Sequence, residues 1–349
     1  MAEGGSRRIC IMTTGGTISS VYDSEIGAYR PGMSIEGLLS GLPKDMGEIE
    51  VVTRDLFQLD SANAQPHHWI EIADAIKTIT KEDSDIHGFV VLHGTDTMVY
   101  SAAAVSFMAQ GLGRPVAFTG SQIPASVPWS DGPRNLRDAI RVAAWADLGE
   151  TCIVFNGEIH RATRARKLRE RAHDAFDSVD PTPLGLLGRD IVLYENRMRR
   201  TSPKPKFKMH LDEEVFLLKV FPGMKPSVIT KIVDLGYHGI VIEGFGSGNI
   251  PTRENALGGV IKEALERGCT VLMSTQCPFG QADLSLYEVG KAALKVGALS
   301  AYDMTSEAAF VKLMWSLGQT DDLSEIAEII HTNIVGEITM SPGAGMRGT

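Results

Sequence analysis

Residues 9–17 read Ile-Cys-Ile-Met-Thr-Thr-Gly-Gly-Thr, a short apolar run that ends at two glycines between threonines. Similar runs recur along the chain and alternate with segments whose apolar residues follow the period of an amphipathic helix. This alternation predicts an α/β fold with mainly parallel sheets. The expected strands are Ile9–Thr13, Glu50–Thr53, Gly88–Leu92, Val116–Thr119, Cys152–Phe155, Val215–Phe221, Gly239–Glu243 and Thr270–Ser274. The expected helices are Trp69–Ile79, Tyr100–Gln110, Asn135–Ala146, Glu254–Arg267, Ser306–Leu317 and Ser324–His331.

One segment, residues 197–208, interrupts this alternation. It is polar, basic and contains prolines, which is typical of a linker. We therefore expect a larger N-terminal α/β domain (residues 1–195), a linker (196–212) and a smaller C-terminal α/β domain (213–349).

Composition excludes several classes of protein. The 349 residues include 43% hydrophobic and 22% charged side chains, as in an ordinary globular protein that buries a core. The net charge of -9 argues against non-specific nucleic-acid binding, which needs cationic surface. No apolar run reaches the roughly 18 residues needed to cross a bilayer, and the N-terminal run is too brief for a signal peptide. We expect a soluble, cytoplasmic protein with no nucleic-acid or membrane partner.

The cysteines and histidines show no metal-binding pattern. There is no CxxC pair and no HExxH motif, so we predict neither a metal nor another cofactor. Cys10, Cys152 and Cys269 lie in apolar runs and are expected to be buried. A catalytic role for Cys277 is an alternative to a structural thiol.

Polar residues gather after the expected strands, where ligands bind in open α/β sheets. The Thr14–Thr17 turn is either structural or a cradle of exposed N–H groups, although the GK[ST] ending of a Walker loop is missing. Asp96, in the segment Leu92–Met98, either caps the next helix or holds a substrate ammonium.

Three further segments leave their function open. Residues 59–62 could offer a hydroxyl and N–H groups to a carboxylate, and residues 119–122 follow another strand, but in isolation each fits a plain turn. The basic stretch 160–171 could be a solvated face, an RNA contact, or the source of one lysine drawn toward a Thr/Asp cluster.

Two motifs together carry a resemblance. Thr14-Gly-Gly-Thr-Ile18 and His93-Gly-Thr-Asp-Thr-Met98, in that order on successive strand ends, closely resemble the two signatures of the bacterial-type L-asparaginase family. The similarity covers roughly residues 8–340, and its flanks look most like the type I, cytoplasmic branch. The resemblance implies an amidohydrolase that cleaves L-asparagine to L-aspartate and ammonia.

The resemblance also implies roles for single residues. Thr17 matches the nucleophile, Tyr29 the tyrosine that helps to activate it, and Thr95, Asp96 and Lys167 a second triad. Ser61 matches the serine that binds the substrate α-carboxylate, while Asp96 also holds the α-amino group. The expected substrate-binding set is Gly16, Asp60, Ser61, Ala62, Gly94, Ser121 and Asn249. Because Asn249 matches a residue that reaches a neighbouring protomer, we expect a homodimer or homotetramer.

Chemistry agrees with these roles in part. A hydroxyl nucleophile needs a base, and a lysine serves as one only if burial or neighbouring charge lowers its pKa. Asp96 would favour the ammonium, so Lys167 acts either through Thr95 and a water or by positioning. The N–H groups at Gly16 and Gly94 are expected oxyanion donors for an acyl-enzyme pathway on Thr17.

Two alternatives remain. The D subunit of the archaeal glutamyl-tRNA(Gln) amidotransferase shares this body, and the basic stretch near Lys167 is compatible with it; that protein usually has an extra domain ahead of the first strand, where this sequence has about a dozen residues. A non-catalytic sensor on the same fold is the other. The two threonines, Asp96 and the lysine argue against a sensor.

Overall fold

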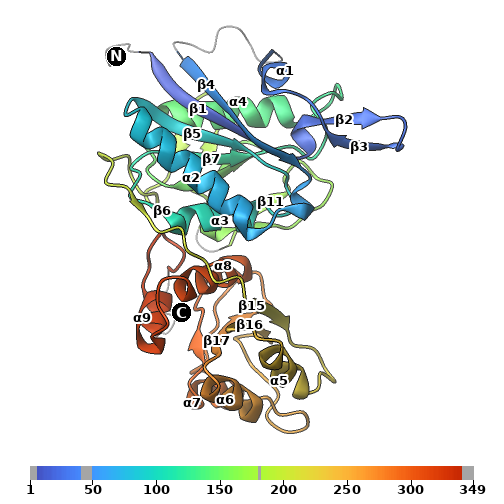
Figure 1. Ribbon diagram of the computed structural model, residues 1–349, viewed down its shortest axis with the longest axis vertical. Helices are drawn as coiled ribbons and strands as arrows, with labels where there is room; N and C mark the ends of the chain where they lie inside the picture. Colours follow the sequence, from blue (N-terminus) through green and yellow to red (C-terminus); the bar gives the residue numbers. More distant parts are fainter. Residues whose placement is uncertain (1–5, 41–48, 180–181, 340–349) are drawn as a thin grey trace. The chain divides into compact units, whose positions relative to one another are not determined.

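The computed structural model describes residues 6–40, 49–179 and 182–339. Within these ranges the chain forms two compact units, one from residues up to 178 together with 182–209 and the other from residue 210 onward. Both units combine helices with mainly parallel sheet (Figure 1). The predicted fold class, a larger and a smaller α/β part, is confirmed.

The larger unit is built on an eight-stranded sheet. Its strands are β1 (Arg7–Gly15), β4 (Ile49–Leu59), β5 (Ile86–Leu92), β7 (Val116–Thr119), β8 (Thr151–Phe155), β9 (Glu158–Arg161), β12 (Gly185–Leu187) and β13 (Ile191–Leu193). They lie in the order β13–β12–β9–β8–β7–β5–β1–β4. The five strands from β4 to β8 are parallel, whereas β9, β12 and β13 are antiparallel.

Helices cover both faces of this sheet. They are α1 (Ile35–Ser40), α2 (Pro66–Glu82), α3 (Met98–Met108) and α4 (Gly132–Trp145). Figure 1 shows α2 and α3 on one face and α4 on the other. Successive side chains of a strand point to opposite faces, so Ile9 and Ile11 pack with Leu136 and Ile140 of α4, while Cys10 and Met12 are buried on the other face. A parallel sheet covered on both sides explains why β1 is apolar throughout.

The register of the parallel strands brings the polar turns together. Thr13 of β1 is paired with Leu92 of β5, and Leu92 is paired with Thr119 of β7. Gly15 is paired with Leu59 of β4. The carboxyl ends of four strands are therefore level, and the segments that follow them start side by side.

The segment predicted as a linker is hydrogen-bonded to the larger unit. Arg200 donates through Nη2 to the carbonyls of Ala143 and Ala146 at the end of α4, at 3.2 and 3.1 Å. Lys204 N donates to Gly111 O at 2.8 Å. Strand β14 (Lys206–Phe207) then pairs with β6 (Ala109–Gln110). The Arg200 side chain thus binds carbonyls at a helix end that lack an intrahelical partner. The division between the units falls after residue 209.

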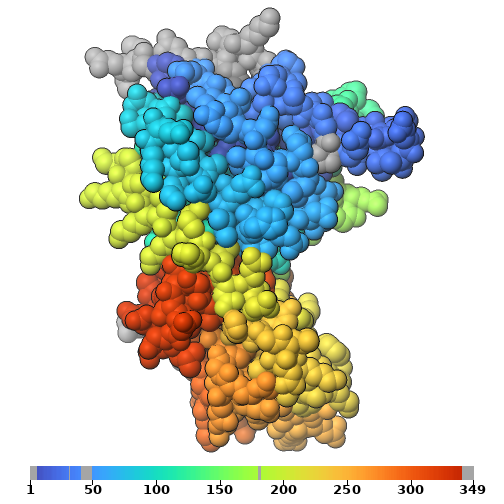
Figure 2. All heavy atoms as spheres, viewed as in Figure 1, coloured from blue at the N-terminus to red at the C-terminus, as the bar shows by residue number. Residues whose placement is uncertain are grey.

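A hairpin leaves the larger unit after β1. It consists of β2 (Ser20–Asp23) and β3 (Ala28–Pro31), paired antiparallel. An ion pair of 2.5 Å between Arg30 and Asp23 spans it. Figure 2 shows this blue segment standing out from the surface. Much of the stretch that follows Thr17 is therefore a two-stranded hairpin.

The smaller unit has its own parallel sheet and core. Its strands, in the order β15–β16–β17–β18, are β15 (Val215–Lys219), β16 (Gly239–Gly244), β17 (Thr270–Thr275) and β18 (Leu299–Ser300). Its helices are α5 (Ser227–Asp234), α6 (Gly258–Glu266), α7 (Glu288–Lys295), α8 (Ser306–Leu317) and α9 (Leu323–His331). Lys312 of α8 and Glu337 form a fully buried ion pair of 2.6 Å, and Lys312 Nζ also donates to Ile330 O. This pair holds the segment after α9 against α8.

Among the residues that the structure describes, no helix is both long and apolar enough to cross a membrane.

Candidate active site

Three strand-end turns of the larger unit touch through glycines. A Cβ atom on Gly16 would lie 2.4 Å from the backbone nitrogen of Gly94, and one on Gly94 would lie 2.5 Å from Ser61 Oγ. Gly16 also has a φ of 81°, which side chains other than glycine rarely adopt. These contacts require glycine at both positions, and they set Thr17, Thr95 and Ser61 around one point.

A cavity of about 130 Å³ opens where these turns meet. It is lined by Gly16, Thr17, Asp60, Ser61, Gly94, Thr95, Asp96, Gln122, Lys167 and Glu170. The two motifs, about eighty positions apart in the sequence, thus share one pocket. Pockets that hold drug-sized ligands measure about 300–1,000 Å³, so this cavity suits a ligand of few atoms.

Lys167 enters the pocket from β10 (Ala165–Lys167), which pairs with β11 (Phe176–Ser178). Its Nζ donates to Thr95 Oγ1 at 2.8 Å and to Asp96 Oδ1 at 2.6 Å. The lysine side chain is 15% exposed and the Asp96 side chain 62%. Of the three interpretations of the basic stretch, the structure supports a lysine drawn to the Thr/Asp cluster. Arg161, by contrast, forms a buried pair with Glu150.

The alternative role of Asp96 as a helix cap is not what the structure shows. Helix α3 has Thr97 as its N-cap residue, with no capping bond from a side chain. The Thr97 hydroxyl instead donates to Ser61 O at 2.7 Å, which ties the Ser61 turn to the Thr95 turn. The Asp96 carboxylate is thus free of a structural cap and faces Lys167.

Thr17 is the first residue of a short 3₁₀ turn, η1 (Thr17–Ser19). Gly16 O accepts from the hydroxyls of Ser19 and Ser20, which fixes the turn. Among the described residues, none forms a hydrogen bond with the Thr17 hydroxyl. Thr17 is partly exposed and lines the cavity, as a nucleophile must.

One predicted role of Gly16 needs correction. Its N–H donates to Leu59 O at 3.0 Å, so it is already used and is not a free oxyanion donor. The parallel pairing of Gly15 with Leu59 brings that carbonyl to it. Gly16 lines the pocket through its backbone and by letting Gly94 approach.

Asp60 and Ser61 line the pocket, but Ala62 does not. Asp60 precedes the 3₁₀ turn η2 (Ser61–Asn63) and accepts the N–H of Ala62 at 2.9 Å. This cap uses the N–H group that the sequence suggested for a substrate carboxylate. Ser61 is buried and keeps its hydroxyl next to Gly94.

After β7 the structure brings Gln122 into the pocket, and not Ser121, which is fully buried. Both oxygens of Asp131 accept the backbone N–H of Gln122, at 3.1 and 3.0 Å, and this sets the direction of the turn. Because Asp131 acts from nine positions later, local spacing could not distinguish Gln122 from Ser121. Glu170, the other unpredicted lining residue, lies just after β10.

Tyr29 and Asn249 are not among the residues that line the cavity. Tyr29 lies on β3, is 50% exposed and packs edge-on against Tyr22 with ring centres 5.4 Å apart. Asn249 belongs to the smaller unit, in a turn where Phe245 and Asn249 form an isolated bridge. Their predicted roles remain predictions.

His93 is a buried residue that contacts the turn carrying Gly94 and Thr95. Its Nδ1 lies 2.7 Å from Gly94 O and its Nε2 lies 2.9 Å from Ser101 Oγ. A carbonyl can only accept, so Nδ1 carries the hydrogen and Nε2 accepts from the Ser101 hydroxyl. The imidazole is neutral in this arrangement and fixes the turn that carries Thr95.

Acidic pH should weaken the fold through this group and a second histidine. Burial lowers the pKa of His93 to about 4 and that of His160 to about 4. The unfolded chain takes up these protons near pH 6.5, so the stabilisation is complete above pH 6.5 and declines as the pH falls toward 4. Each histidine should lower the free energy of unfolding by about 2 kcal/mol by pH 5.

Urea unfolding at pH 7 and pH 5 measures this loss. The variants His93→Gln and His160→Gln should each reduce the difference between the two pH values by about 2 kcal/mol. Equal pH dependence in the parent protein and in both variants would contradict the assignment.

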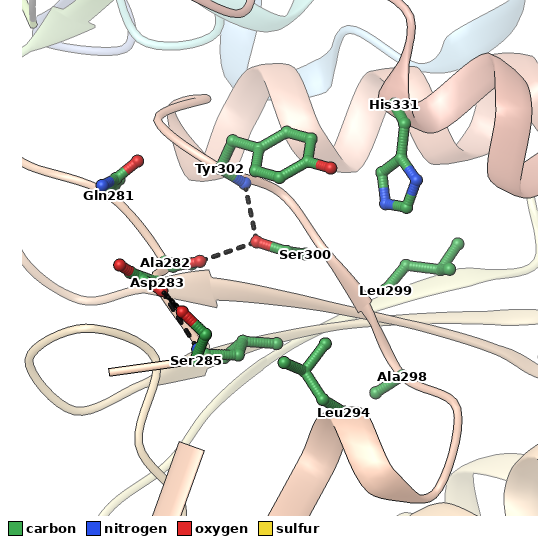
Figure 3. Close-up of a pocket in the computed structure, with 11 residues that line it drawn as sticks. Gln281, Ala282, Asp283, Ser285, Leu294, Ala298, Leu299, Ser300, Tyr302 and His331 are labelled. Atoms are coloured by element: carbon green, nitrogen blue, oxygen red, sulfur yellow. Dashed lines mark hydrogen bonds between the residues drawn. The ribbon is translucent and has the colours of Figure 1, made fainter. Parts of the chain in front are cut away.

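Another cavity lies in the smaller unit and has a different character. It measures about 150 Å³, and Leu294, Ala298 and Leu299 line one side (Figure 3). Its two serine hydroxyls are engaged, because Ser300 Oγ donates to Ala282 O and Ser285 Oγ donates to Asp283. The pocket around Thr17 is therefore the better candidate for catalysis. Across the described ranges, no group of three or more His, Cys, Asp or Glu residues is placed to hold a metal.

Comparison with known proteins bears on this pocket. Residues 8–199 match the family model described as Asparaginase, N-terminal, and residues 214–330 match the Glutaminase/Asparaginase C-terminal domain. The chain is 39% identical over 342 residues to the D subunit of the glutamyl-tRNA(Gln) amidotransferase of Pyrococcus horikoshii, covering 95% of this chain and 76% of that protein. It is 38% identical over 336 residues to an L-asparaginase of Thermococcus kodakarensis, covering 96% and 100%.

Solved structures agree with the sequence matches. The thermostable L-asparaginase from Thermococcus kodakarensis superposes with a TM-score of 0.87 at 36% identity, covering 96% of this chain and 100% of that chain. L-asparaginase I from Vibrio cholerae superposes with a TM-score of 0.85 at 32% identity, again covering 96% and 100%.

Proposed function

The chain belongs to the asparaginase family of hydrolases, and we propose that it cleaves L-asparagine to L-aspartate and ammonia through an acyl-enzyme on Thr17. One observation carries the proposal: the Lys167 ammonium binds Thr95 and Asp96 in the same small cavity that Thr17 lines. A hydroxyl nucleophile, a paired cation and a free carboxylate oxygen are the groups that amide hydrolysis of an amino acid needs.

The charges of the pocket fit a small zwitterion. Asp96 uses Oδ1 for Lys167, which leaves Oδ2 to accept a substrate ammonium. The Ser61 hydroxyl, buried on the other side of Gly94, can donate to the α-carboxylate. An analogue without either charge would leave one of these groups unpaired, and such losses discriminate strongly between substrates.

The reaction would proceed in two balanced steps. Thr17 Oγ1 attacks the side-chain carbonyl carbon, an ester forms and the C–N bond breaks, while the threonine proton leaves with the nitrogen as ammonia. Water then attacks the ester, which frees aspartate and restores the Thr17 hydroxyl. We assign the oxyanion to the N–H groups of Gly94, as the sequence suggested, and of Thr17, since that of Gly16 is bonded to Leu59 O.

In this scheme Lys167 acts by positioning and not as a base. Its Nζ donates a charge-assisted hydrogen bond to Asp96 Oδ1 at 2.6 Å, which holds both side chains in place. The ammonium in turn orients Thr95 and Asp96 toward the substrate. Its positive charge also stabilises the negative charge that develops on the amide oxygen.

Further parts of the proposal come from the family resemblance. We propose that Tyr29 joins the site when the β2–β3 hairpin folds over bound substrate, because it lies on that hairpin's exposed face. We also propose a cytoplasmic homodimer or homotetramer in which Asn249 reaches a neighbouring copy.

A second candidate function rests on the sequence comparison. Several relatives at 34–39% identity are named as the D subunit of glutamyl-tRNA(Gln) amidotransferase. The same pocket would then release ammonia from an amide for another protein to use. Co-purification of the chain with tRNA or with a second protein of such a complex would favour this alternative.

A substrate panel tests the proposed function. We expect ammonia release from L-asparagine at a higher kcat/KM than from L-glutamine, and almost none from asparagine analogues that lack the α-ammonium or the α-carboxylate. The expected loss for each missing charge is about 10²-fold or more, because either Asp96 or Ser61 would lose its charged partner in the bound complex. Equal turnover of a charge-free amide would rule out this binding mode.

A further inference from the structure

We propose that Gln122 is a positioning residue that sets the direction of the hydrogen bonds running through Thr95 to Lys167. Gln122 Oε1 accepts from Thr95 Oγ1 at 3.1 Å, and Thr95 Oγ1 accepts from Lys167 Nζ at 2.8 Å. The catalytic meaning of this inference rests on the proposed function, but the hydrogen-bond direction itself does not.

Backbone carbonyls fix the orientation of the Gln122 amide. Its Nε2 donates to Glu170 O at 2.9 Å and lies 3.3 Å from both Arg169 O and Ala172 O. An amide rotated by 180° would turn Oε1 toward three carbonyl oxygens, none of which can donate. The only satisfied orientation points Oε1 at Thr95.

That orientation decides what Thr95 can do. A threonine hydroxyl has a single hydrogen, and Oε1 of an amide can only accept, so the Thr95 hydrogen is committed to Gln122. The oxygen lone pairs then face Lys167, which must be the donor. Thr95 cannot hand its proton to Lys167 while its hydroxyl donates to Gln122, and Lys167 Nζ donates to both Thr95 and Asp96.

The backbone of Gln122 is held as firmly as its side chain. Asp131, only 8% exposed, accepts the N–H groups of both Gln122 and Ile123. Asn135 donates from Nδ2 to Asp131 and to Gly120 O, both at 3.0 Å. The two ends of the bond network are thus anchored, one by α4 and the other by the loop after β10.

The variant Gln122→Leu tests the proposal, because leucine fills similar space without an acceptor. We expect kcat to fall by about 10-fold and KM to change by less than about threefold, because the freed Thr95 hydroxyl can rotate. A tenfold change equals about 1.4 kcal/mol, which is the scale of one hydrogen bond. The matched control is Gln110→Leu, a half-buried glutamine that donates to Phe107 O away from the pocket. It should leave kcat unchanged.

A double-mutant cycle separates positioning from general support. If Gln122 acts through Thr95, adding Gln122→Leu to a Thr95→Val enzyme should change kcat by less than about twofold. Thr95→Ser, which keeps the hydroxyl, should restore the sensitivity to Gln122→Leu. Additive losses in the Thr95→Val background would overturn the proposal.

A spectroscopic readout makes the test independent of the substrate. The Nζ protons of Lys167, which are bonded to Thr95 and Asp96, should exchange slowly with water, and ¹⁵N-edited NMR spectra measure this proton exchange. Gln122→Leu should speed this exchange at least severalfold, whereas Gln110→Leu should not. Unchanged exchange would refute the positioning role even if asparagine is hydrolysed, and faster exchange would support it even if asparagine proves to be the wrong substrate.

Discussion

Replacing Thr17 by alanine is expected to lower kcat for asparagine hydrolysis by at least about 10³-fold, the usual scale for loss of a nucleophile. Thr17 lines the cavity and none of the described residues forms a hydrogen bond with its hydroxyl, so the substitution breaks no structural hydrogen bond there. The melting temperature should therefore stay within a few degrees of that of the parent protein. Steady-state ammonia release and thermal unfolding measure the two effects.

Thr95 offers the natural comparison, because it is the other threonine that lines the cavity. Its hydroxyl donates to Gln122 and accepts from Lys167, so it is poorly placed to attack a carbonyl. Mass spectrometry of enzyme quenched during turnover should find the acyl group on the peptide that contains Thr17. An adduct on Thr95, or retained turnover in Thr17→Ala with Thr17→Ser as the conservative control, would reassign the nucleophile.

Much of the fold follows from local pattern. The expected helix Ser306–Leu317 has the observed bounds of α8, and the expected strand Val116–Thr119 has those of β7. Strands buried on both faces are nearly all apolar, and such runs end abruptly at polar turns, which makes their carboxyl ends readable. The short helices α5 and α7 were not predicted, because eight residues give barely two turns of helical period.

The parts of the site that lie directly after strands could be predicted from the sequence. The Thr17 and Thr95 turns and the Lys167 side chain come together as the resemblance implied, because the parallel register leaves strand ends level. Gln122 was missed because the turn around it is set by Asp131 and by carbonyls some fifty positions later. Interactions of this range leave no trace in residue spacing.

The basic segment 197–208 shows the same limit. Its prolines and charges suggest a free linker, yet Arg200 and β14 bind it along the larger unit. Composition reports how a segment would behave in isolation. The carbonyls at the end of α4 are unsatisfied acceptors, and an arginine nearby in space uses them regardless of composition.

Substituting Gly16 by alanine is expected to reduce kcat/KM by at least about 10²-fold, although the substitution removes no polar group from the pocket. The added Cβ would lie 2.4 Å from Gly94 N, whereas ordinary contacts begin at 3.4 Å, so one turn must move by about 1 Å. A displacement of that size between a nucleophile and its partners can cost about 10²-fold in rate. Steady-state kinetics with asparagine provide the measurement.

The control for this prediction separates crowding from backbone strain. Gly236 also has a positive φ, 95°, but a Cβ there meets nothing within 4 Å. Gly236→Ala should therefore cost stability of about 1 kcal/mol or more from strain, yet leave kcat/KM unchanged. If Gly16→Ala retained full activity, the close approach of Gly16 to Gly94 could not be what aligns Thr17 with Thr95. A large loss at Gly16 with full activity at Gly236 would instead identify that contact as the element that joins the two motifs.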